Sequence, residues 1–321
     1  MPRAFYRMVR KWGSFVRFSH TIFALPFALA AMMVAAGENR GWPGWKTFLL
    51  ILLAMICART CAMSFNRIVD RKFDALNPRT RDRHLPAGHI TPGSAIGLCV
   101  ASSAGLVVAA YFLNPVCLFL SPVALGVICF YSLTKRFTDF THVFLGIALA
   151  LAPIGSWLAV KGSLGFPPIR GMFASTAALE AWLAAARTAL EPIVLALAVV
   201  FWLTGFDIIY ALQDHEFDKA HGLRSLVVAW GPKNALDAAF LAHVFTCGFL
   251  YLFGVFCGFR IVYLAGLLII AGCLLLEHWI ARRRSLAWIN LAFFRLNAVI
   301  SAVFLAVTAA EVIFAGGFKF R

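Results

Sequence analysis

The chain has 321 residues, of which 62% are hydrophobic and only 13% are charged. Soluble globular domains of this length do not have such a composition, so the sequence indicates a polytopic membrane protein. The net charge of +15 would favour nucleic-acid binding in a soluble protein. We expect no nucleic-acid partner here, because the basic residues can be assigned to one side of a membrane.

Nine apolar segments have the length that a helix needs to cross a membrane, which is about 20 residues. We predict transmembrane helices at 20–37, 45–66, 93–113, 115–133, 141–160, 191–211, 235–255, 259–280 and 291–314. These segments follow one another almost without a break. We therefore expect an all-α fold with a single transmembrane domain over residues 1–321, in which nine helices surround a central cavity.

The distribution of Lys and Arg predicts an orientation. With the N-terminus in the cytoplasm, the inside segments carry more than twice as many Lys and Arg residues as the outside segments. This agrees with the positive-inside rule and predicts an integral protein of the bacterial plasma membrane, whose active site lies on the cytoplasmic side. The basic segment Met1–Arg17, with its interleaved aromatic residues, is expected to lie on membrane lipid.

The second predicted span ends in an acidic motif. Asn66, Asp70 and Asp74 are spaced by four residues and share one helix face, and Arg59 lies two turns earlier on the same face. An arginine inside a span is a candidate for a functional role, although pairing with a carboxylate is an equal alternative. The basic loop after Asp74 either closes over an anionic group or is a solvated loop on the positive side.

Later spans contribute further polar positions. Tyr131 and Lys135 share a face at the end of the fourth span, and Arg295 in the ninth span could face the cavity. Residues 161–190 form the only sizeable outside loop of the sequence. We expect a short helix at Ala177–Leu190 to lie on the outer surface.

The sixth span ends in a second acidic motif. Asp207, Tyr210, Asp214 and Asp218 form one predicted helical stripe, and residues 214–218 repeat the Asp-x-x-Phe-Asp pattern of residues 70–74. Each motif ends an even-numbered span, and the two spans are four apart, so both motifs should point the same way. One site between two similar halves of the chain is therefore expected.

Four aspartates from two helices suit two Mg²⁺ ions that bridge a diphosphate, because Mg²⁺ binds one or two carboxylates together with phosphate oxygens and water. We predict Asp70, Asp74, Asp214 and Asp218 as metal ligands and, with Asn66, as catalytic residues. Such a site serves cleavage of an allylic C–O bond, in which metal and nearby cations stabilise the departing diphosphate. The basic residues expected to bind the diphosphate are Arg71, Lys135, Arg136 and Lys219.

The remaining allylic cation needs an electron-rich acceptor, most simply an aromatic ring. An apolar helical wall excludes water from the cation, and tyrosine rings can stabilise it. The residues expected near the acceptor are Arg59, Tyr131, Asp207, Tyr210 and Arg295. Of these, Arg59 or Arg295 is expected to hold a carboxylate of the acceptor.

Three linked motifs give the chain a resemblance to a known family. They are Asn66-x-x-x-Asp70-x-x-x-Asp74, Tyr131-Ser-x-Thr-Lys135-Arg136 and Asp207-x-x-Tyr-Ala-x-Gln-Asp214-x-x-x-Asp218. With these motifs the chain resembles the UbiA family of membrane-bound prenyltransferases over nearly its whole length. The resemblance implies a nine-span helical fold, Mg²⁺ as cofactor, a polyprenyl diphosphate donor, and diphosphate binding by Arg71 and Lys135.

Two branches of the family remain open. The second acidic motif resembles that of 4-hydroxybenzoate polyprenyltransferases of ubiquinone synthesis. In contrast, His20–Phe27 and Arg59–Asn66 resemble the related enzyme of the futalosine route to menaquinone. Outside the family, the alternative is a polytopic secondary transporter of a small anionic substrate, which also has charged residues within the membrane and a repeat.

Overall fold

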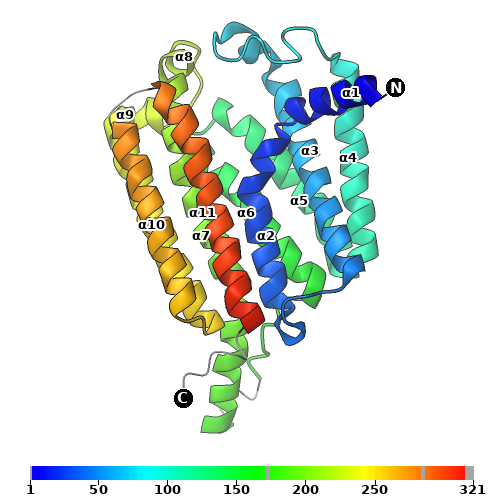
Figure 1. The fold of residues 1–321 in the computed structure, drawn as a ribbon, viewed down its shortest axis with the longest axis vertical. Helices are drawn as coiled ribbons and strands as arrows, with labels where there is room; N and C mark the ends of the chain where they lie inside the picture. Colours follow the sequence, from blue (N-terminus) through cyan, green and yellow to red (C-terminus); the bar gives the residue numbers. More distant parts are fainter. Residues whose placement is uncertain (1, 171, 173, 283–285, 315–321) are drawn as a thin grey trace.

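The computed structural model describes residues 2–170, 172, 174–282 and 286–314. Over these residues the chain forms helices and turns without a strand (Figure 1). Nine of its helical segments are long and apolar enough to cross a membrane. The prediction of an all-α protein with nine candidate spans is therefore confirmed.

Eleven α-helices follow one another along the described chain. They are α1 (Pro2–Phe15), α2 (Thr21–Ala35), α3 (Trp45–Leu76), α4 (Pro92–Leu113), α5 (Pro115–Phe130), α6 (Thr141–Lys161), α7 (Thr176–Ala211), α8 (His215–Ala220), α9 (Leu226–Cys257), α10 (Ile261–Arg282) and α11 (Leu286–Phe314). Short 3₁₀ helices occur at η1 (Phe18–His20), η2 (Gly37–Asn39), η3 (Tyr131–Arg136) and η4 (Leu212–Asp214).

The second span, α3, continues beyond its predicted end and carries the whole first acidic motif as helix. It contains no internal Gly or Pro over Trp45–Leu76. It ends at Asn77, which has extended angles of φ −82° and ψ 120°. A proline disfavours the helical conformation of the residue before it, so Pro78 explains this end.

The sixth span, α7, lies inside the bundle between α6 and α9. Its residues Leu195, Trp202 and Leu203 are almost fully buried. The backbone of α6 approaches α7 closely at Gly146, where an added Cβ would lie 2.5 Å from the carbonyl oxygen of Val200. This contact fixes the spacing of two helices that contribute to the site described below.

The predicted short surface helix at Ala177–Leu190 is wrong. These residues are the first turns of α7, which runs without a break from Thr176 to Ala211 and keeps Pro192 in its interior. A proline inside a span is tolerated where neighbouring groups satisfy the freed backbone. The first turns of α7 therefore project from the bundle as a continuation of the span (Figure 1).

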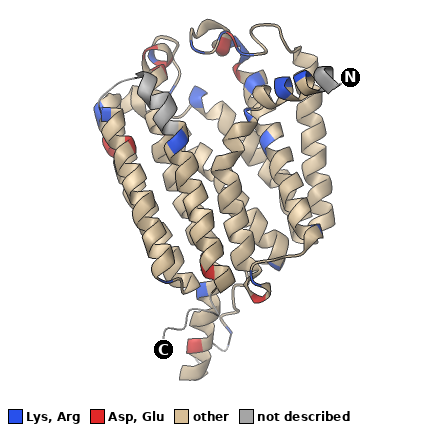
Figure 2. Ribbon diagram, in the orientation of Figure 1, with Lys and Arg blue, Asp and Glu red and all other residues tan. Residues whose placement is uncertain are grey.

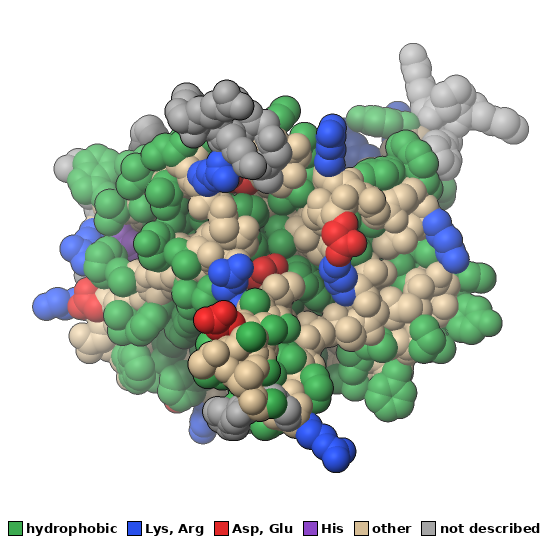
Figure 3. Space-filling model, turned by 90° about the horizontal axis from the view of Figure 1, so that it is seen from below, with side chains coloured by type: hydrophobic (Ala, Val, Ile, Leu, Met, Phe, Trp, Pro, Cys, Tyr) green, Lys and Arg blue, Asp and Glu red, His purple; other side chains and the backbone are tan. Residues whose placement is uncertain are grey.

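Large apolar side chains face outward along the spans. Phe119 is 81% exposed and Leu268 is 75% exposed. Figure 3 shows hydrophobic side chains around the rim of the molecule, and Figure 2 shows most charged residues near the end of the bundle that carries α1 and α8. This distribution fits a bundle whose sides contact lipid hydrocarbon.

Candidate active site

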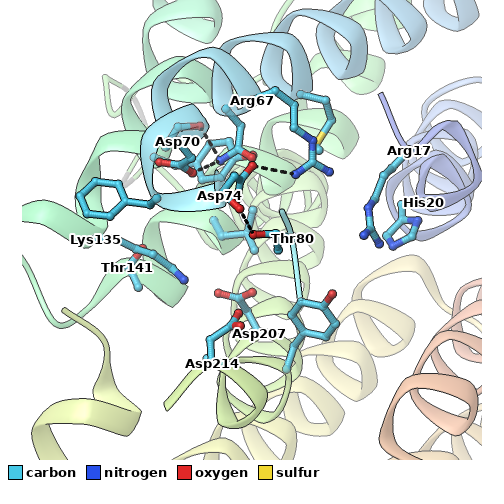
Figure 4. Close-up of a pocket in the computed structure, with 18 of the residues that line it drawn as sticks. Arg17, His20, Arg67, Asp70, Asp74, Thr80, Lys135, Thr141, Asp207 and Asp214 are labelled. Atoms are coloured by element: carbon cyan, nitrogen blue, oxygen red, sulfur yellow. Dashed lines mark hydrogen bonds and ion pairs between the residues drawn. The ribbon is translucent and has the colours of Figure 1, made fainter. Parts of the chain in front are cut away.

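A cavity of about 530 Å³ lies at the end of the bundle that carries the two acidic motifs. All four motif aspartates line it, so the structure brings the two motifs together as the sequence predicts. The other predicted site residues that line the cavity are Asn66, Arg59, Tyr131, Lys135, Arg136, Asp207 and Tyr210. Figure 4 shows Asp70 and Asp74 across the cavity from Asp207 and Asp214.

The first aspartate pair projects from the last turns of α3. Asn66 Nδ2 donates a hydrogen bond to Asp70 Oδ2 at 3.0 Å, and Arg136 Nη2 lies 3.4 Å from Asp70 Oδ1. Asp74 Oδ1 accepts a hydrogen bond from Arg83 Nη1 at 2.6 Å. The spacing of four residues on one helix thus places both carboxylates on the cavity wall, each beside a guanidinium from another segment.

The second pair follows the end of α7 and does not share its helix. Asp207 and Tyr210 are on α7, but Asp214 lies in η4 and Asp218 on α8, so the predicted continuous stripe is broken after Tyr210. Asp218 Oδ2 lies 3.5 Å from Lys135 Nζ. The break turns the chain, yet both carboxylates still line the cavity.

Asp214 is held by the loop between α3 and α4. Its Oδ1 accepts hydrogen bonds from Arg79 Nε at 2.8 Å and Asn77 Nδ2 at 3.1 Å, and Arg79 Nη2 contacts Oδ2. Arg79 Nη1 also donates to the hydroxyl of Tyr210 at 2.9 Å. Burial lowers the pKa of Arg79, but these hydrogen bonds and the Asp214 charge outweigh burial, so its pKa is raised above the usual value.

The carboxylate oxygens of the cavity are suitable ligands for Mg²⁺, but they do not form one closed cage. Among the described residues, no three His, Cys, Asp or Glu side chains converge on a point where they could hold one metal ion. The carboxylates instead stand in two pairs, and Asp74 and Asp218 each have a buried Oδ2 without a hydrogen bond. Because Mg²⁺ needs only one or two carboxylates when phosphate oxygens complete its shell, each pair can serve one ion.

Three predicted basic residues do not line the cavity. Arg71, Lys219 and Arg295 are exposed, and each is the neighbour in sequence of a residue that does line it. One residue along a helix turns the side chain by about 100°, which directs these residues away. Their predicted roles in binding diphosphate or acceptor therefore have no support from the geometry.

Several cavity residues were not among the predicted site residues. Arg67, Arg79 and Arg83 line the cavity beside the carboxylates, and Arg17 and His20 line it from the junction of α1 and α2. Arg17 has left-handed backbone angles of φ 47° and ψ 55°, an uncommon conformation for a residue other than glycine. The basic composition of residues 79–84 was the only sequence signal for the loop arginines.

An apolar chamber of about 200 Å³ adjoins the cavity between α2, α3, α4, α5 and α6. His20, Arg59, Tyr131 and Leu149 line both spaces, so the chamber begins where the polar cavity ends. Small residues form much of its wall, including Ala54, Ala58, Ala110, Ala148, Ala152 and Gly155. A polar pocket for an anionic group thus leads into a narrow space suited to an apolar chain.

Fold and site together define a polytopic membrane protein in which a polar cavity adjoins an apolar chamber. Residues 24–299 match the sequence model of the UbiA prenyltransferase family, and the chain belongs to this family. The predicted resemblance is confirmed, and membership in a prenyltransferase family favours an enzyme over the transporter.

Named relatives and solved structures agree with this assignment. The chain is 27% identical to a 4-hydroxybenzoate octaprenyltransferase of Paraburkholderia phytofirmans, over 84% of this chain and 85% of that protein. It is 29% identical to the protein of the same name from Methylobacillus flagellatus, over 84% and 83%.

Among solved structures, a UbiA homolog from Aeropyrum pernix K1 in its apo form superposes with a TM-score of 0.75 and 29% identity, over 91% of this chain and 98% of that chain. A UbiA homolog from Archaeoglobus fulgidus bound to GPP and Mg²⁺ has a TM-score of 0.66 and 22% identity, over 94% and 99%, and shows the same fold.

Proposed function

We propose that this protein transfers a polyprenyl group from a polyprenyl diphosphate to a small aromatic acid, with Mg²⁺ as cofactor. The observation that carries the proposal is the position of two carboxylate pairs and several cationic side chains in one cavity beside an apolar chamber. The names of the relatives, 4-hydroxybenzoate octaprenyltransferase, and the GPP and Mg²⁺ of a homologous structure support it.

The donor's diphosphate fits the acidic and basic part of the cavity. Asp70, Asp74, Asp214 and Asp218 would hold Mg²⁺, which would neutralise the diphosphate and make it a better leaving group. Lys135, Arg136 and the loop arginines supply further positive charge at the same place. The allylic C–O bond breaks with its electron pair on the diphosphate.

The prenyl chain fits the apolar chamber. Its wall is formed largely by alanine, leucine and other apolar residues, which keep water away from an allylic cation. Tyr131 lies where chamber and cavity meet, so its ring can stabilise the cation at the reacting end of the chain.

The acceptor's carboxylate fits the basic group formed by Arg17, His20 and Arg59. Arg59 Nη2 donates a hydrogen bond to the backbone oxygen of Arg17 at 3.4 Å, whereas its buried Nε has no hydrogen-bond partner. Of the two arginines predicted to hold the carboxylate, the geometry favours Arg59, since Arg295 is exposed outside the cavity.

Two finer points belong to the same proposal. The acceptor is 4-hydroxybenzoate, as the relatives' names suggest, or a menaquinone-pathway aromatic acid such as aminodeoxyfutalosine. The cavity faces the cytoplasm of a bacterial plasma membrane, because the end of the bundle with α1 and α8 carries most of the basic residues (Figure 2).

The test is mass spectrometry of lipids formed by membranes that contain the protein, with Mg²⁺, geranyl or octaprenyl diphosphate, and either aromatic acid. A prenylated 4-hydroxybenzoate supports the ubiquinone branch, and a prenylated aminodeoxyfutalosine supports the menaquinone branch. Absence of product from both acids, in membranes where the folded protein is detected, would refute the proposal. A chelator should abolish product formation.

A further inference from the structure

A buried histidine on α6 contacts an aspartate of the cavity wall. His142 Nδ1 lies 2.6 Å from Asp207 Oδ2, and the His142 side chain is completely buried. The contact joins α6 to α7 one helical turn from Gly146, where the backbone of α6 lies close to Val200 of α7. The positions of both side chains are therefore fixed by the packing of the two helices.

The contacts determine which nitrogen of the imidazole carries the proton. An ionised carboxylate can only accept hydrogen bonds, so Nδ1 of His142 is the donor to Asp207. The other nitrogen, Nε2, is buried and has no hydrogen-bond partner. A proton on Nε2 would be left unsatisfied, which favours the tautomer with the proton on Nδ1.

Asp207 differs in its partner from the other aspartates of the cavity. Asp70, Asp74, Asp214 and Asp218 each form an ion pair with Arg or Lys. Among the described residues, no Arg or Lys forms an ion pair with Asp207. Its side chain is 21% exposed and lines the cavity. Since His142 occupies Oδ2, Oδ1 is the oxygen left for a ligand.

We propose that His142 is a positioning residue that holds Asp207 so that Oδ1 accepts a hydrogen bond from the ring hydroxyl or amino group of the acceptor. This rests on the proposed prenyl transfer and adds to it. The acceptor is then an aromatic acid bound at two ends, its carboxylate at Arg59 and its donor group at Asp207. The other four aspartates are paired with Arg or Lys, whereas Asp207 contacts an imidazole through Oδ2, so its Oδ1 remains an acceptor at the cavity wall.

The same contact assigns the protons of the transfer. The C–O electron pair first leaves with the diphosphate. As a pair of ring electrons then forms the C–C bond to the allylic cation, the proton on the ring oxygen or nitrogen passes to Asp207 Oδ1. The substituted ring carbon then loses its proton to the diphosphate, its C–H electrons restore the aromatic ring, and Asp207 returns the first proton. One proton is released per turnover, and His142 keeps its Nδ1 proton throughout.

The experiment compares His142→Leu, which cannot donate a hydrogen bond, with His142→Asn, whose amide nitrogen takes the place of the imidazole Nδ1 and can donate one. For His142→Leu we expect kcat to fall by about 10-fold to 100-fold, with the acceptor KM raised and the donor KM within about twofold of wild type. His142→Asn should recover most of the loss. His142→Gln, whose amide nitrogen takes the place of Nε2, serves as the second loss variant if His142→Leu does not accumulate in a folded form.

A double-mutant cycle decides whether His142 acts through Asp207. In an Asp207→Asn background, His142→Leu should cause no further loss of kcat. Losses that multiply in the double variant, equal effects on both KM values, or a His142→Asn variant as impaired as His142→Leu would each overturn the proposal and indicate a merely structural histidine. Absence of product from the wild-type protein would instead overturn the proposed function together with this inference.

Discussion

Arg79 Nε lies 2.8 Å from Asp214 Oδ1, and Nη2 of the same guanidinium contacts Oδ2. An arginine from the loop after the first acidic motif thus binds the first aspartate of the second motif. Arg83, from the same loop, binds Asp74 of the first motif. The loop therefore links both carboxylate pairs and places positive charge where a diphosphate would arrive.

The loop arginine is expected to matter for the donor more than for the acceptor. Arg79→Gln removes the bidentate pair and leaves Asp214 with Asn77 as its hydrogen-bond donor. We expect the donor KM to rise by about 10-fold or more and the acceptor KM to change little, because a charge-assisted contact at the diphosphate end is lost. The matched control is Arg81→Gln, an exposed arginine of the same loop that does not line the cavity. An equal effect of both variants would show that only the net charge of the loop matters.

The four motif aspartates are expected to be required individually. Asn at Asp70, Asp74, Asp214 or Asp218 removes one anionic ligand, and we expect activity to fall on the order of 100-fold or more. Mg²⁺ with inorganic diphosphate should raise the melting temperature of the wild-type protein but not of these variants, since ligands that bind only the folded state stabilise it. Asp82→Asn, an exposed position on the loop, is the control. Full activity of the Asp70→Asn and Asp214→Asn double variant would contradict the metal assignment.

Periodicity in the sequence was enough to predict the spans and the meeting of the two acidic motifs. The apolar lengths set the nine candidate helices, and the spacing of Asp70 and Asp74 set their common face. Periodicity did not predict the end of α7. The sequence pattern indicates one continuous helical stripe there, but the chain changes from α7 to η4 and then to α8. Basic residues next to the motif aspartates were assigned site roles from the sequence, and some of these residues lie outside the cavity. Charge alone does not reveal that Arg71 points away from Asp70.

The tertiary partners could not have been found from spacing. His142 and Asp207 are 65 residues apart, and Arg79 and Asp214 are 135 residues apart. Each pair depends on how two segments pack, which no local pattern encodes. In the sequence, nothing distinguishes His142 from other polar residues near the start of a span. Only the closeness of α6 and α7 brings it to the cavity wall.

Arg59 and Arg295 provide a test of the acceptor site, because the sequence analysis predicted that either could hold the acceptor's carboxylate. Arg59→Gln should raise the acceptor KM by about 10-fold or more and leave the donor KM nearly unchanged, because a charge-assisted contact to a carboxylate is lost. Arg295→Gln should behave as wild type, since Arg295 is exposed outside the cavity. Steady-state kinetics with each substrate varied in turn distinguish the two. Equal changes in both KM values for Arg59→Gln would point to a structural role.

The close approach of α6 and α7 predicts a stability effect. A Cβ at Gly146 would lie 2.5 Å from the Val200 carbonyl oxygen, so Gly146→Ala must push the helices apart. We expect destabilisation of about 1–3 kcal/mol, measured as a lower melting temperature in detergent. Gly126→Ala, at a lipid-facing position with nothing within 4 Å of the added Cβ, is the control and should be neutral. Identical melting temperatures for the two variants would contradict the predicted contact.

The apolar chamber predicts a change in donor preference. Gly155 lines the chamber, and a Cβ there meets nothing within 4 Å, so Gly155→Leu extends a side chain into the open space without displacing backbone. The variant should use geranyl diphosphate almost as well as the wild-type protein does, because the short chain still fits the chamber. Its activity with octaprenyl diphosphate should fall by about 10-fold or more, which corresponds to the loss of about two buried methylene groups from the chamber. The acceptor KM should not change if the aromatic acid binds in the polar cavity, as we propose. Gly126→Leu makes the same substitution on the lipid-facing side of α5 and should leave the ratio of the two donors unaltered. If Gly155→Leu reduced activity with both donors equally, the prenyl chain would have to lie elsewhere, since a ligand outside the chamber cannot sense a side chain that fills it.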